Sequence, residues 1–102
     1  SEGYPCSDYK SWKEFEPMIP EEHRAVFADL DSFGIPIPSE SYCGLKIPGT
    51  SVSTEALFKW EDRKVLVYDR DSQKPDILGW TSLYADEIKP AEFVELFQGG
   101  KH

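Results

Sequence analysis

The chain has 102 residues, a length that suits one domain with a small hydrophobic core. Apolar residues make up 39% and aromatic residues 14%, which excludes a chain that is disordered by composition. The formal net charge of −8 disfavours direct nucleic-acid binding by the isolated chain, because phosphate binding requires clustered Lys and Arg.

The chain begins with a helical lead-in over residues 7–34. We expect a short helix over residues 9–16, capped by Ser7 or Asp8 and ended by Pro17. A second helix is expected over residues 20–33, because proline suits a first helical position and acidic residues follow it. Its apolar stripe has helical spacing and consists of Val26, Leu30 and Phe33, widened by Phe27.

The middle of the chain reads as a sheet over residues 41–85. Two prolines exclude a helix from the linker that precedes it, residues 34–40. β-Branched and aromatic residues bounded by turn residues predict four strands, over residues 41–47, 52–60, 64–69 and 79–85. The charged sequence EDRK, residues 61–64, is expected to be the turn of a hairpin.

A last helix is expected over residues 90–98, beginning at Pro90 and ending before Gly99. The predicted fold class is therefore α+β: two N-terminal helices, a four-stranded and mostly antiparallel meander, and one C-terminal helix. We expect residues 1–102 to form a single domain.

Cys6 and Cys43 are the only cysteines, too few for a zinc quartet or a disulfide scaffold. We expect free thiols in a reducing compartment, while one bridge between the two cysteines stays open. The sequence contains no run of eighteen apolar residues and no N-terminal signal pattern. These features favour a cytoplasmic protein without a membrane contact.

Candidate chemistry is confined to a few side chains. His23 is off the apolar stripe of its helix, and the only other histidine is the terminal His102, so a surface position is expected for His23. A magnesium or manganese nuclease needs two acids that share an ion and a lysine that orients water. Glu55, Asp69 and Lys64 could supply that set, with Glu55 and Asp69 as the metal ligands.

Residues 34–83 resemble the restriction-endonuclease-like tail of bacterial defence-type DEAD/DEAH helicases, a PD-(D/E)XK domain, and are similar in outline to the very-short-patch-repair endonuclease group. The resemblance rests on short motifs: a strand ending in Trp (ALFKW, 56–60), a charged turn (EDRK, 61–64), an apolar strand (VLVY, 65–68) and a later Gly-Trp (79–80). It implies a nuclease-like fold.

The resemblance also places the two acids of the family's metal site on Leu57 and Tyr68, neither of which can bind a divalent ion as a carboxylate does. It therefore implies a degenerate copy without catalytic residues or cofactor, acting as an accessory domain that contacts a protein partner or neighbouring domain. Trp60, Trp80 and Tyr68 are the interaction residues expected for it.

Two alternatives stay open. The first is an active nuclease that uses Glu55, Asp69 and Lys64 with Mg²⁺ or Mn²⁺. The second is a small acidic interaction protein, or a mimic of nucleic-acid charge, which the net charge of −8 favours.

Overall fold

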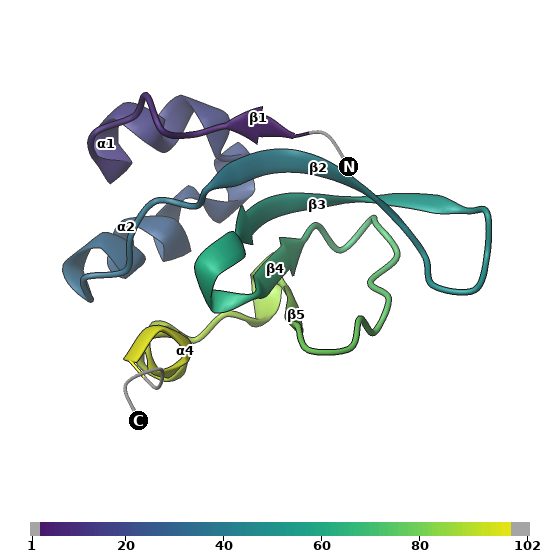
Figure 1. Cartoon of the computed structure of the whole chain (residues 1–102). Helices are drawn as coiled ribbons and strands as arrows, with labels where there is room; N and C mark the ends of the chain where they lie inside the picture. The colour runs from purple at the N-terminus through teal and green to yellow at the C-terminus, as the bar shows by residue number, and fades with distance from the viewer. Residues whose placement is uncertain (1–2, 99–102) are drawn as a thin grey trace.

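The computed structural model describes residues 3–98 and has an α+β fold built on one five-stranded sheet (Figure 1). The strand order follows the sequence. The strands are β1 (Tyr4–Pro5), β2 (Glu40–Lys46), β3 (Ser53–Trp60), β4 (Val65–Tyr68) and β5 (Thr81–Tyr84). No helix in this part of the chain has the length and apolar character needed to cross a membrane.

The helices are short. They are α1 (Trp12–Phe15), α2 (Arg24–Ser32), α3 (Pro90–Phe93) and α4 (Glu95–Gln98), supplemented by four 3-10 turns, η1 (Glu16–Met18), η2 (Glu21–His23), η3 (Glu61–Arg63) and η4 (Ala85–Glu87). Ser11, and neither Ser7 nor Asp8, caps α1, since its hydroxyl accepts the Glu14 amide at 3.2 Å. The expected helix at 20–33 is divided between η2 and α2, and the expected helix at 90–98 between α3 and α4.

The sheet corrects the predicted meander in two ways. β1, which was not predicted, pairs antiparallel with β2. β5 pairs parallel with β4, so that Val65 lies beside Thr81 and Tyr68 beside Tyr84. The connecting loop, residues 69–80, returns along the length of β4, as a parallel pair requires a crossover of about a dozen residues. Thus the fourth predicted strand exists, with its direction reversed.

The two faces of the sheet are covered differently. Aromatic side chains from the helices pack on one face, where Trp12, Phe15, Phe27 and Phe93 meet Phe58 and Trp60 in the larger core. The second face carries a smaller cluster of Cys43, Ala56, Leu66 and Tyr68. Within residues 3–98, the partly buried apolar side chains that pack against this cluster all come from outside the α-helices: Leu45, Ile77, Trp80 and Tyr84. The long β2–β3 hairpin and the loop between β4 and β5 extend together away from the helices (Figure 1).

Side-chain alternation along β3 is interrupted at Leu57. Leu57 and Phe58 are consecutive, yet both belong to the larger core, while Ala56 belongs to the smaller one. The facing residue of β2 is Tyr42, whose φ of 54° is in the left-handed region that favours glycine. The paired residues on either side, Ser41 with Phe58 and Cys43 with Ala56, keep a constant register. The side chains of β3 therefore change from one face of the sheet to the other at this point. The change accompanies the left-handed backbone of Tyr42 and involves no extra residue in either strand.

The charged sequence 61–64 connects β3 to β4, as predicted, and its form is a 3-10 turn, η3, followed by Lys64 at φ 55°. All four of its residues are exposed. The Lys64 ammonium lies over the Trp80 ring, 5.3 Å from the centroid. The turn thus belongs to the surface of the fold, at the end of β4 that is remote from Asp69.

Candidate functional site

A cleft of about 550 Å³ opens where β4 ends, beside η2 and the start of α2. Four carboxylates and one guanidinium line it: Glu22, Asp69, Asp71, Asp86 and Arg70. His23 also lines it and is buried, with 8% of its surface exposed. This corrects the expected surface position of His23.

Three side chains of this cleft converge. His23 Nε2 faces Asp69 Oδ2 at 3.8 Å, too far for a hydrogen bond. Glu22 joins this pair, because one possible ligand atom from each of the three side chains lies within 4.8 Å of the other two. Glu22 and His23 come from η2, whereas Asp69 directly follows β4, so tertiary packing alone brings them together.

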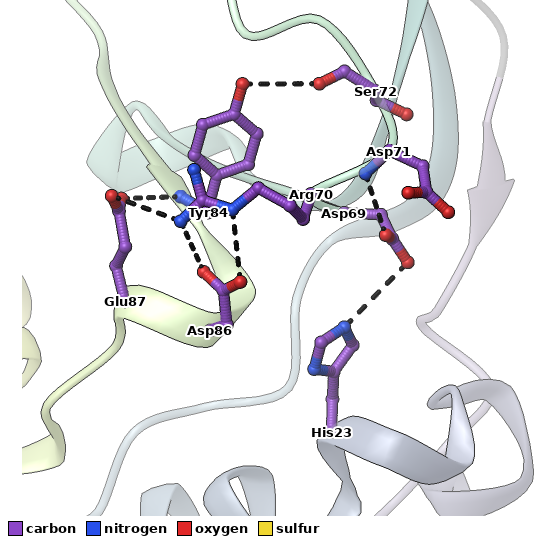
Figure 2. A network of polar contacts seen from close by, with 8 residues as sticks. All are labelled: His23, Asp69, Arg70, Asp71, Ser72, Tyr84, Asp86 and Glu87. Carbon is purple, nitrogen blue, oxygen red and sulfur yellow. Dashed lines mark hydrogen bonds and ion pairs between the residues drawn. The ribbon is translucent and has the colours of Figure 1, made fainter.

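The Asp69 carboxylate is oriented by its own loop. Its Oδ1 atom accepts the backbone N–H of Asp71 at 3.1 Å, which turns Oδ2 towards His23 (Figure 2). A side-chain oxygen that accepts an amide two residues later is a typical stabilising feature of such turns. The loop therefore presents one free carboxylate oxygen to the imidazole.

Arg70 also lines the cleft, and its side chain contacts Asp86, Glu87 and Tyr84 (Figure 2). Its guanidinium donates to both oxygens of Asp86, at 2.7 and 3.1 Å, and lies 4.0 Å from the Tyr84 ring centroid. Glu87 Oε2 lies 3.4 Å from a guanidinium nitrogen of Arg70. The hydrogen bonds from Arg70 lower the pKa of Asp86 below its ordinary value. Arg70 is thus neutralised by its own partners, and its charge does not offset Glu22 and Asp69.

The pKa of Tyr42 is affected by the acidic residues on this side of the sheet. Its hydroxyl donates to the Met18 carbonyl at 3.2 Å. Burial raises the pKa of Tyr42, and the charges of Glu55, Asp69 and Glu22 raise it further. Acids from β3, the β4–β5 loop and η2 therefore surround one region, although Glu55 is not among the three donors that converge.

The nuclease set suggested by the sequence does not assemble. Lys64 and Asp69 lie beyond the two ends of β4, and the four residues of this strand separate their Cα atoms by about 17 Å. A lysine at that distance cannot orient water at an ion held by Asp69. Glu55 is exposed on β3, where it faces Gly44 of β2.

The positions that the resemblance assigns to acids are core positions. Leu57 is 5% exposed and Tyr68 is fully buried. Burial raises the pKa of Tyr68 to about 12, although the Ser82 hydroxyl beside it acts in the opposite direction. Both side chains contribute packing.

The expected interaction residues have different surroundings. Trp60 is buried in the larger core, where its Nε1 donates to the Pro36 carbonyl at 2.8 Å. Tyr68 is buried in the smaller cluster, so neither Trp60 nor Tyr68 presents a surface to a partner. Trp80 is half-buried and lies on the face that no α-helix of residues 3–98 covers.

Sequence reasoning missed the contribution of Glu22 and His23. The pair stands next to the apolar stripe of α2, and no local spacing connects it to Asp69, which follows 46 residues after His23. Both cysteines are buried and free, in line with the expected thiols. The terminal residues Gly99 and His102 lie outside the described range.

A comparison of the chain with models of known protein families gives no match, and neither do comparisons with curated proteins and with solved structures.

Proposed function

We propose that this chain is a non-catalytic, nuclease-like accessory domain of a nucleic-acid-processing or defence protein, and that it works by contacting a protein partner or neighbouring domain. The observation that carries the proposal is the burial of Leu57 and Tyr68 at the positions where the resemblance requires metal-binding acids. An apolar side chain in a packed core cannot be exchanged for an ionised carboxylate without a large loss of stability.

The position of Lys64 adds support. In an active nuclease of the kind considered, the lysine must reach the water or phosphate at the metal, whereas here it lies beyond the opposite end of β4 from Asp69. Its ammonium lies over Trp80. The residues that could hold an ion and the residue that could assist hydrolysis are therefore separated by the strand.

The face with the smaller cluster is the part of the surface best suited to a partner. Trp80 and Ile77 are only half-buried there, and Leu78 of the same loop is fully exposed. Exposed apolar side chains around a partly covered aromatic residue are typical of protein interfaces. The two free, buried thiols favour a reducing compartment, so we assign this domain to the cytoplasm.

A nicking assay tests the lack of catalysis. Purified protein is incubated with supercoiled plasmid and Mg²⁺ or Mn²⁺, and we expect no cleavage above that of a buffer control. Cleavage that is lost in Glu55→Ala or Asp69→Ala would refute the proposal and identify an active nuclease.

A binding experiment tests the contact. If the reading frame continues upstream into a helicase, that segment is the probe, and Leu78→Asp should weaken its binding to this domain. Phe33→Asp is the matched control, since Phe33 is also an exposed apolar side chain and lies at the end of α2, on the helix side. Equal weakening by both variants would argue against the assigned face.

A further inference from the structure

We propose that Glu22, His23 and Asp69 form a binding site for a divalent transition-metal cation of the Zn²⁺ class. The site does not rest on the proposed accessory function, and it differs from a magnesium nuclease site in both its donors and its cation. One imidazole nitrogen and two carboxylate oxygens, all within 4.8 Å of one another, are the donor set.

The imidazole is the observation that distinguishes this cluster from a group of surface acids. His23 is more than nine-tenths buried, and its Nε2 atom has no hydrogen-bond partner among the residues of the described chain. A buried polar nitrogen without a partner costs free energy of folding. Because Nε2 points at Asp69 Oδ2 across 3.8 Å, an ion between them would satisfy both atoms (Figure 2).

The distance between His23 and Asp69 suits a small cation after a minor adjustment. Zinc binds nitrogen and oxygen at about 2.0–2.2 Å, so two ligands of a tetrahedral site are about 3.4 Å apart. Closing the 3.8 Å gap between Nε2 and Oδ2 therefore needs a shift of only a few tenths of an ångström. Glu22 is exposed, and its side chain is free to complete the shell by rotation.

The residues around the site favour a positively charged ion, and the imidazole favours a transition metal. The carboxylates of Asp71 and Asp86 also line the cleft, and the one guanidinium, Arg70, is already bound to Asp86 and Glu87. A cation there meets an excess of negative charge. Imidazole favours Zn²⁺ and its transition-metal neighbours, whereas Mg²⁺ favours oxygen ligands and keeps its waters.

The Asp71 amide supports the ligand geometry from outside. By donating to Asp69 Oδ1, it leaves Oδ2 as the oxygen directed at the site. Such outer contacts are typical of metal-binding carboxylates. Three protein ligands leave a fourth position open towards the cleft, where water or a partner's side chain can bind. An ion here would connect η2 to the end of β4.

Metal-free protein titrated with Zn²⁺ at neutral pH provides the test. Long-range ¹H–¹⁵N spectra should show the His23 imidazole shifting on Zn²⁺ addition, and calorimetry should give one ion per chain. Mg²⁺ at the same concentration should leave the imidazole unchanged. The His102→Ala variant separates the two histidine signals and removes the terminal imidazole. Cobalt substitution should give no intense sulfur-to-metal absorption, because neither cysteine is a ligand.

Variants locate the site. His23→Ala and Asp69→Asn should each weaken Zn²⁺ binding by about tenfold or more. Glu22→Gln should weaken it as well, and because Glu22 is exposed this variant leaves the core intact. Glu21→Gln is the matched control, with the same charge change on the adjacent exposed residue of η2, and should bind as the parent does.

Three results would overturn the assignment. The first is an unshifted His23 imidazole at saturating Zn²⁺. The second is equal weakening by Glu21→Gln and Glu22→Gln, which would mean that the ion responds to the general acidity of the surface. A folded Glu22→Gln variant with parental affinity would exclude that carboxylate as a ligand and refute the three-donor site.

Discussion

Leu57→Asp places a carboxyl where the nuclease resemblance requires an acid and thereby tests whether this position is core. The wild-type side chain is 5% exposed within the larger core. Losing its burial costs about 1.5–3 kcal/mol. Desolvation can also raise the pKa of a fully buried carboxyl by about 3–5 units, and each unit corresponds to about 1.4 kcal/mol.

The effect of the introduced carboxyl on the free energy of unfolding depends on pH, and the direction of its pKa shift determines its sign. The folded-state pKa of the introduced carboxyl would lie above the unfolded value of about 4, so the folded protein binds more protons between these two values. Stability therefore falls as pH rises, by about 1.4 kcal/mol per pH unit, or about 4 kcal/mol from about pH 5 to about pH 8. A domain of this length has a free energy of unfolding of about 5–15 kcal/mol, so the variant approaches its unfolding midpoint at the higher pH.

Leu57→Asn is the control, because it has nearly the same shape and no ionisable group. Urea unfolding followed by tryptophan fluorescence would give the free energy of unfolding for both variants at both pH values. We expect the gap between them to widen by about 4 kcal/mol towards the higher pH. A gap independent of pH, or a stable Leu57→Asp variant that cleaves DNA, would refute the assignment of this position to the core.

Three further predictions follow from buried or paired groups. Trp12→Phe should cost about 2–4 kcal/mol in urea unfolding, because it leaves the buried Ile35 carbonyl without its 2.6 Å hydrogen bond and shrinks the core. Acid titration should show stability lost as pH falls through the lowered pKa of Asp86, and Arg70→Gln should remove that contribution. Cys43 should resist alkylation at pH 8 until urea unfolds the chain, since burial raises its pKa to about 12; rapid labelling of folded protein would contradict this.

Local patterns in the sequence predicted much of the sheet. Each end of β2, β3 and β4 lies within one residue of its predicted position, because alternating apolar residues and flanking turns depend only on near neighbours. The short helices were placed less well. The hydrogen bond from the Glu14 amide to Ser11, and the division of residues 20–33 into η2 and α2, depend on caps and turns that several residue types can form.

The candidate site was the part least accessible to sequence reasoning. Asp69 was identified as a possible metal ligand, but the partners suggested for it, Glu55 and Lys64, followed from closeness along the chain. In the fold, Lys64 lies beyond the far end of β4, while His23 and Glu22 reach Asp69 from η2. A buried histidine off the apolar stripe carries no local mark of its burial.

The sequence by itself therefore determined the α+β class, the order of the helices and main strands, and the apolar character of Leu57 and Tyr68. Tertiary structure decided the parallel direction of β5, the meeting of His23 with Asp69, and the second face of the sheet, which no α-helix of residues 3–98 covers. The physical reason is that periodicity records which face of a strand or helix is buried. It does not record which other element that face packs against. Those contacts form only when the loop at residues 69–80 and the packing of η2 and α2 bring distant residues together.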